Sequence, residues 1–435
     1  MNFPLILRKL YAEIMKIFES IFVQNIAWMT GVSVLERIAA LLQTIIIART
    51  LGITEYGVYG LLFGTIGFTA SVAGLQMGLT ATVFVARYKT TNKAKARRII
   101  QYVNRFALIV SAVLLLSCLP FSRQISIWLL SSGQYEVIIV MGCVFIVGSL
   151  LSGVQDGVAQ GFEDFKAVAI IKALTSLATL AVIFFVAKKV GLEGVLLVLL
   201  GGTLLKYLLL YFVVRRHQAD QSFPREGTGV KFSDLVWGFS APSMLTTLVW
   251  GFAAWFGMYM LSKQPAGFDE VAIVNTGIQW RGPLLLISSA ISSVAIPKYS
   301  RLNSTGDSSL AKSLQSKLLW VNGAAAFLVV AVLAALVQPI LGLYGDGFIG
   351  GKYIFVLIIA TAVPQIIAQV YMQKLVGDGQ LWLQFWLHLP FAVCLLVGFI
   401  FLIPAYAGLG FAATMVTSTL IYAVYCSVTL RFLRR

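Results

Sequence analysis

The chain has 435 residues, of which 59% are hydrophobic and 11% charged, and its formal net charge is +16. A soluble protein of this length needs more charge to cover its surface, so the composition excludes a soluble globular protein. Apolar blocks long enough to cross a hydrocarbon core of about 30 Å recur along the chain. They lack the alternation of strands, and lipid leaves no partner for open backbone groups. We therefore predict an all-α polytopic membrane protein.

Twelve candidate membrane spans follow an N-terminal segment, residues 1–23, in which charged residues lie among apolar ones. This first segment is typical of an amphipathic helix on the cytoplasmic membrane surface and lacks the features of a signal peptide. Mean hydropathy places the spans at residues 24–50, 57–86, 99–120, 136–160, 167–187, 191–214, 233–261, 271–297, 314–340, 353–376, 380–403 and 407–430.

The basic residues are distributed unevenly between the loops. If the N-terminus is cytoplasmic, two thirds of the 33 Lys and Arg residues fall in inward-facing segments. This asymmetry is the positive-inside pattern of membrane proteins. The positive charge is therefore a topology signal and gives no support to nucleic-acid binding, and both termini are predicted to be cytoplasmic.

The chain divides into two halves of six spans each. A polar, basic segment with Pro and Gly, residues 215–232, is predicted to link an N-terminal bundle, 24–214, to a C-terminal bundle, 233–435. The stretch "LGITEYG" after the first span recurs loosely, 215 residues later, as "AGFDEVA" after the seventh span. A duplicated six-helix unit explains this echo.

Small residues repeat along the second span at alternating steps of three and four. They are Gly57, Gly60, Gly64, Gly67, Ser71, Gly74, Gly78 and Ala81. On one continuous helix these positions form a seam that lets a neighbouring backbone approach closely. Helix packing is the preferred interpretation, and sliding of the helix during a transport cycle is the functional alternative.

Catalytic and nucleotide-binding signatures are absent from the sequence. The stretch from Gly345 to Tyr353 fails the phosphate-loop pattern, and His217 and His388 are isolated. The four cysteines lie in or beside apolar spans without metal-ligand spacing, so we predict neither disulfides nor a metal site. The protein is expected to be no enzyme and to need no cofactor, so transport would draw on an ion gradient, the membrane potential or the gradient of the substrate.

Ionisable residues inside membrane spans are costly, and they usually face a protein interior or a water-filled cavity. The candidate cavity cations are Arg37, Arg281, Lys206 and Lys172. Lys172 is shallow enough for its amine to snorkel to the interface instead. Four cations with few carboxylates predict a cavity that attracts an anion. The two carboxylates nearby, Glu36 and Asp156, are candidates for coupling transport to H⁺ or Na⁺.

Polar and aromatic residues in the C-terminal half suit the hydroxyls and rings of sugars. The candidates for sugar contacts are Gln365, Gln369, Gln373, Gln279, Trp250 and Trp255. Two simpler interpretations stay open. A stripe of glutamines can form hydrogen bonds between helices, and a tryptophan is often a core or interfacial residue.

Several motifs together resemble one family of membrane proteins. The stretches "RIAALLQTIIIARTLGITEYGVYG" and "GLQMGLTATVFVARY" resemble the N-terminal signature of bacterial polysaccharide flippases of the Wzx type. These belong to the multidrug/oligosaccharidyl-lipid/polysaccharide exporter superfamily. Further similar stretches are "AQGFEDFKAVAIIKAL", "FSAPSMLTTL", "AIPKYSRL" and "LGLYGDGFIGGKY". Their order and spacing are more specific than any one of them.

The resemblance implies a V-shaped, alternating-access transporter of two six-helix bundles in the bacterial cytoplasmic membrane. It also implies a substrate, an undecaprenyl-diphosphate-linked oligosaccharide that moves to the periplasmic leaflet, with the polysaccharide polymerase machinery as a partner and a monomeric chain. The resemblance implies that Arg37 and Arg281 correspond to the cavity cations of the family. The alternatives are a flippase for the peptidoglycan precursor lipid II, a drug or cation antiporter, and a membrane-embedded glycosyltransferase or polymerase. The mostly positive buried charge disfavours cationic drugs.

Overall fold

The computed structural model describes residues 28, 31–220, 241–293, 308–377 and 380–432. Every regular element in these ranges is helical, which confirms the predicted all-α class. The predicted surface helix of residues 1–23 and most of the predicted linker, residues 221–232, lie outside the described residues.

The N-terminal bundle begins with a helix at Gly31–Leu51. It continues with α2 (Ile53–Ala73), α3 (Met77–Tyr88), α4 (Lys93–Cys118), α5 (Ser122–Leu130), η1 (Gly133–Tyr135), α6 (Glu136–Gly161) and α7 (Phe165–Asp220). Gly191, with a φ of 59°, interrupts α7. Glycine reaches this left-handed region without the steric cost of a Cβ, so α7 supplies two consecutive membrane-crossing segments.

The C-terminal bundle contains α9 (Ala241–Ser262), α10 (Gly267–Ser293), α12 (Ser308–Ala335), α13 (Val337–Tyr344), η3 (Asp346–Gly351), α14 (Lys352–Ala360), α15 (Ala362–Gly377) and α16 (Leu381–Phe432). A break at Ala407 divides α16 into two segments, as Gly191 divides α7. Each of the twelve predicted spans overlaps a described helix. Within the described residues, nine helices are long and apolar enough to cross a membrane.

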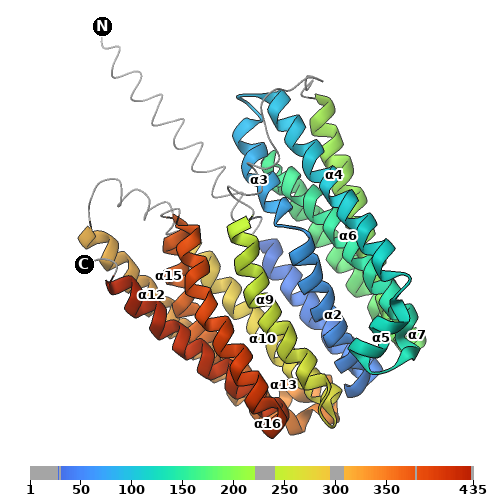
Figure 1. The fold of residues 1–435 in the computed structure, drawn as a ribbon, viewed down its shortest axis with the longest axis vertical. Coiled ribbons are helices and arrows are strands. Elements are labelled where there is room, and N and C mark those ends of the chain that lie inside the picture. The colour runs from blue at the N-terminus through green and yellow to red at the C-terminus, as the bar shows by residue number, and fades with distance from the viewer. Residues whose placement is uncertain (1–27, 29–30, 221–240, 294–307, 378–379, 433–435) are drawn as a thin grey trace.

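The two bundles form a V, as Figure 1 shows. They meet near α5 and α13 and diverge towards the opposite end of the molecule. We call the end where they meet the closed end and the opposite one the open end. One hydrophobic core contains buried residues of both bundles, such as Leu61 and Phe355. A second core, around Ile99, contains residues of the N-terminal bundle alone.

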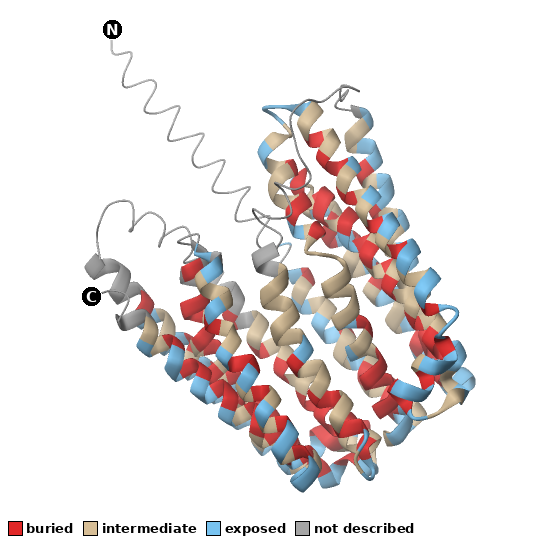
Figure 2. Cartoon of the chain, in the orientation of Figure 1, coloured by how far each residue is buried: buried red, intermediate tan, exposed pale blue. Residues whose placement is uncertain are grey.

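Large apolar side chains cover the outside of both bundles. Phe185, Trp320 and Phe401 are each more than 70% exposed, and Figure 2 shows exposed residues along the outer flanks. Exposed apolar surface on this scale marks contact with an apolar medium, which for helices of this length is lipid. The prediction of a multi-pass membrane protein is confirmed.

The second predicted span is two helices, α2 and α3, and not one continuous helix. The prediction that its small residues form one unbroken seam is therefore wrong. The chain breaks between α2 and α3, where Leu75 and Gln76 adopt positive φ values of 44° and 53°. Before the break, a Cβ on Gly57 would overlap the Phe268 carbonyl of α10, whereas after it one on Gly78 would stand 2.7 Å from the Gly153 carbonyl of α6. The small residues thus serve two different packing surfaces, because the break changes the direction of the helix.

The expectation that the chain forms no disulfide is also wrong. Cys118, the last residue of α4, is bonded to Cys143 of α6. The two residues meet because α4 and α6 pack side by side, and a separation of 25 residues without a sequence motif does not signal this. The other two cysteines, Cys394 and Cys426, are free.

Candidate substrate site between the two helix bundles

Hydrogen bonds hold α2 of the N-terminal bundle against α10 of the C-terminal bundle at the closed end. The Thr54 hydroxyl donates to the Asp269 carboxylate at 2.6 Å, and the Asn275 amide donates to the Tyr56 hydroxyl at 3.3 Å. Thr54 and Asp269 are 215 residues apart, which is the offset of the sequence echo. The two helices that carry the echo therefore pack against each other.

An aromatic layer lies beside these bonds and contains Trp255, one of the predicted sugar contacts. Its indole donates to Thr65 of the N-terminal bundle at 2.9 Å. Its ring stacks on Phe68 and Trp128, with centroid distances of 5.8 and 5.9 Å. The Lys263 amine donates to the Trp128 carbonyl at 2.6 Å, and partial burial lowers the pKa of this lysine. In this conformation Trp255 contributes to contact between the bundles.

The two predicted arginines differ in their surroundings. Arg281 belongs to α10, and Arg37 reaches the same turn of α10 from the first helix. Arg37, on the first helix, is exposed, and its Nη1 would lie 3.6 Å from a Cβ placed on Gly282. Arg281 is 5% exposed, and its Nη1 donates to the Thr361 hydroxyl at 2.9 Å, whereas its Nε has no hydrogen-bond partner. Arg37 therefore presents an exposed charge close to α10, whereas the charge of Arg281 is buried within the C-terminal bundle.

The two predicted lysines belong to a separate, charge-balanced cluster in the N-terminal bundle. The Lys172 amine forms a 2.8 Å ion pair with Asp156, whose other oxygen accepts from the Gln160 amide at 2.8 Å. Asp156 and Glu36 both attract the amine of Lys206 electrostatically. Lys172 is therefore paired with a carboxylate, and Lys206 lies within the electrostatic influence of two.

Three of the predicted sugar contacts converge on a cavity inside the C-terminal bundle. The cavity has a volume of about 430 Å³, and Trp250, Gln365 and Gln369 line it. Gln279 is half-buried on α10 and is not among the lining residues. The side chain of Gln373 lies outside the part of the chain that the structure describes.

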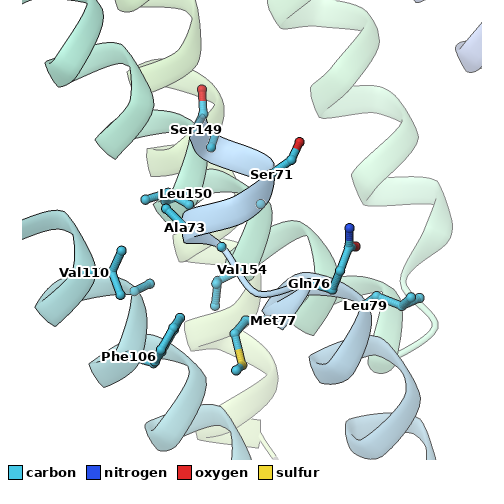
Figure 3. Close-up of a pocket in the computed structure, with 15 residues that line it drawn as sticks. Ser71, Ala73, Gln76, Met77, Leu79, Phe106, Val110, Ser149, Leu150 and Val154 are labelled. Atoms are coloured by element: carbon cyan, nitrogen blue, oxygen red, sulfur yellow. The ribbon is translucent and has the colours of Figure 1, made fainter. Parts of the chain in front are cut away.

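A second cavity, of about 260 Å³, lies in the N-terminal bundle at the break between α2 and α3. Figure 3 shows Phe106 and Val110 of α4 at its side, with Gln76 at the break. The Gln76 amide donates to Thr247 at 3.3 Å, and Thr247 lines the cavity of the other bundle. One hydrogen bond between the bundles thus joins the rims of both cavities. Sequence patterns did not indicate either residue, because Gln76 reaches this place only through its left-handed backbone.

Two helical bundles of membrane-spanning length that meet at one end define a multi-pass membrane protein of V-shaped transporter architecture. The chain belongs to the polysaccharide biosynthesis protein family, whose model matches residues 22–303. This match confirms the family that the quoted motifs resemble. A comparison with curated proteins found no match.

Solved structures share the fold at low sequence identity. A multidrug resistance MATE family transporter of the MOP superfamily, in its inward-facing conformation, is 14% identical with a TM-score of 0.77, over 91% of this chain and 94% of that chain. The lipid II flippase MurJ, in an inward closed conformation, is 13% identical with a TM-score of 0.74, over 93% and 87%. A MOP superfamily transporter from Pyrococcus furiosus is 13% identical with a TM-score of 0.64, over 95% and 96%.

Proposed function

We propose that the protein is a flippase that moves undecaprenyl-diphosphate-linked oligosaccharide units from the cytoplasmic to the periplasmic leaflet of the bacterial inner membrane. The units would serve the synthesis of O-antigen or a related polysaccharide. The observation that carries the proposal is the exposed Arg37 guanidinium against α10, backed by the buried Arg281. Membership of the polysaccharide biosynthesis family supports a glycan as cargo. The chain acts as a monomer beside the polymerase machinery.

The mechanism follows from the two ends of the V. The diphosphate enters from the open end, which is cytoplasmic, and binds at Arg37, because a guanidinium offers two parallel donors to phosphate oxygens. The sugars contact glutamine and aromatic side chains, and the polyprenyl tail stays in the lipid between the bundles. Parting of the bonds at the closed end then exposes the head group to the periplasm.

Glu36 and Asp156 remain the candidates for coupling to H⁺ or Na⁺. The ion pair of Asp156 with Lys172 and the electrostatic influence of both carboxylates on Lys206 support the candidacy, since a proton or cation on either carboxylate changes the local charge. Transport that is indifferent to proton and sodium gradients, or a fully active Glu36→Gln variant, would remove this part of the proposal.

The test is complementation of a strain that lacks the chain, with surface polysaccharide and membrane abundance measured together. Arg37→Ala should lower surface polysaccharide at least tenfold, because a hydrogen bond to a charged group contributes about 1.5–3 kcal/mol. Arg105→Ala is the matched control, since Arg105 is an exposed arginine on α4. Wild-type polysaccharide in the Arg37→Ala strain would contradict the proposal.

Lipid analysis of the same deletion strain separates the alternatives. A polysaccharide flippase predicts that lipid-linked repeat units accumulate on the cytoplasmic leaflet while peptidoglycan synthesis continues. Accumulation of the peptidoglycan precursor would identify a lipid II flippase, and loss of drug resistance alone would identify a drug antiporter.

A further inference from the structure

The cavity of the C-terminal bundle has a polar but uncharged lining. It lies among α9, α10, α15 and α16, and none of its described lining residues is Asp, Glu, Lys or Arg. Its volume of about 430 Å³ is near the lower end of the range for small-molecule pockets, about 300–1,000 Å³. The space suits one or two sugar rings and is too small for a whole glycan repeat unit.

One wall of this cavity carries a hydrogen-bonded chain with a fixed direction. His388 Nδ1 lies 2.8 Å from the Gln384 carbonyl, which can only accept, so Nδ1 carries the proton. In the neutral ring Nε2 is then an acceptor, and it lies 3.0 Å from the Tyr422 hydroxyl. Tyr422 therefore donates to His388, and its oxygen lone pairs are left to accept from a ligand or from the neighbouring Cys426 thiol.

The opposite wall supplies amides and an aromatic ring. The Oε1 atom of Gln365 is buried without a hydrogen-bond partner, and Gln369 lies one helical turn further along α15. A buried acceptor without a partner is unusual in a folded protein, and the Gln365 side chain that carries it lines the cavity. The ring of Trp250 adds a flat apolar surface. The Tyr422 oxygen and the glutamine amides can form hydrogen bonds with sugar hydroxyls, and the Trp250 ring can stack on the apolar face of the sugar. This combination suits a sugar ring.

The cavity also adjoins the space between the bundles. Its lining residue Thr247 accepts the hydrogen bond from Gln76 of the N-terminal bundle at 3.3 Å. A ligand in this cavity therefore lies beside an interbundle bond that has to change when the bundles separate.

We propose that this cavity binds one uncharged sugar of the transported glycan, recognised by the Tyr422 hydroxyl and the amides of Gln365 and Gln369. The proposal rests on the flippase function proposed above and specifies the sugar class of its substrate. An acidic sugar is disfavoured, because its carboxylate would find no cation among the described residues of the lining. His388 is a positioning residue, since it acts by orienting the Tyr422 hydroxyl.

The test uses the full-length protein in lipid nanodiscs and soluble probes whose binding is measured by calorimetry. The neutral probes are diacetylchitobiose, lactose and maltose, the acidic probe is a disaccharide that contains glucuronate, and the anionic probe is inorganic pyrophosphate. We expect a neutral disaccharide to bind and the acidic one not to bind. Tyr422→Phe should weaken the neutral probe about tenfold, and Tyr425→Phe on the same helix is the matched control, as Tyr425 is 37% exposed.

Pyrophosphate distinguishes this proposal from the flippase function. It should bind Tyr422→Phe normally and lose affinity for Arg37→Ala, whereas the neutral sugar should show the reverse. His388→Gln, which keeps an acceptor for the tyrosine, should retain more neutral-sugar affinity than His388→Leu. If Tyr422→Phe fails to fold, Gln369→Leu takes its place.

Three results would overturn the sugar site: no neutral disaccharide binds, the acidic one binds equally well, or Tyr422→Phe leaves neutral binding intact. If instead neutral binding behaves as expected but pyrophosphate does not bind and Arg37→Ala keeps its surface polysaccharide, the flippase proposal fails and the sugar site stands.

Discussion

Thr54 and Asp269 occupy corresponding positions in the two halves of the chain, 215 residues apart, and form a 2.6 Å hydrogen bond with each other. Gly60 and Asn275 have the same separation in the sequence, and a Cβ on Gly60 would lie 3.1 Å from the Asn275 amide nitrogen. Corresponding residues of two repeats meet where a two-fold axis passes between them. The closed end thus brings together α2 and α10, the two helices that carry the sequence echo, as a two-fold arrangement of a duplicated unit predicts.

Asp269→Ala should shift the protein towards opening at this end. Loss of the bond from Thr54 should cost about 1 kcal/mol, because the pair is partly solvated, and this changes the ratio of the two conformations several-fold. Spin labels at positions 123 and 353 lie in opposite bundles near the closed end. The distribution of electron–electron distances between them would measure the change in the ratio of the two conformations. Asp346→Ala, which removes an exposed carboxylate near the same end, is the control. An unchanged distance distribution in Asp269→Ala would contradict the role of this bond.

Gly57→Ala and Gly64→Ala should differ although both lie on one face of α2. A methyl group on Gly57 would overlap the Phe268 carbonyl, whereas nothing lies within 4 Å of the corresponding position at Gly64. Overpacking of this kind costs about 1–3 kcal/mol. We expect a lower thermal midpoint for Gly57→Ala and an unchanged or slightly higher one for Gly64→Ala, measured by size exclusion after heating. Equal midpoints would show that the two bundles do not pack closely at Gly57.

Removing Asp156 should destabilise the protein because it leaves the Lys172 amine without its carboxylate. The side chains of this ion pair are each 15% exposed, so the cost should lie near the lower end of the 3–5 kcal/mol typical of breaking a buried pair. Asp156→Asn should thus lower the thermal midpoint, and the double variant Asp156→Asn/Lys172→Met should recover most of it. A double variant no more stable than Asp156→Asn alone would contradict a direct pairing of the two side chains.

The disulfide can be counted with a maleimide that adds mass to each free thiol of the denatured chain. Without reductant two thiols should react, and after reduction all four. Cys118→Ser should raise the unreduced count by one, since Cys143 loses its partner. Reaction of all four thiols without reductant would contradict the bond. Because disulfides persist in oxidising compartments, the expected result also supports a periplasmic location for the closed end.

Sequence periodicity predicted the elements well and their partners poorly. Long apolar segments located the described helices, since each had to satisfy its own backbone within the membrane. The break after Ala73 was missed because the small residues around it continue the helical spacing, and only the backbone angles of Leu75 and Gln76 reveal it. Among the candidate site residues, position within the spans favours Arg37 over Arg281 and Lys206, and Lys172 least. In the structure Lys172 is paired with Asp156 of α6, and Asp156 and Glu36 act on Lys206.

The amino-acid sequence alone determined the class of this protein, its family and the presence of rare charges within apolar spans. Hydrophobic segment length, the positive-inside asymmetry and the order of motifs are all local or additive properties. Tertiary structure decided which cation lies exposed between the bundles, which cysteines are bonded, and that glutamines of α15 share a cavity with His388 and Tyr422 of α16. These outcomes depend on helix packing between segments far apart in the chain, and no local pattern specifies which side chains that packing brings within hydrogen-bonding distance.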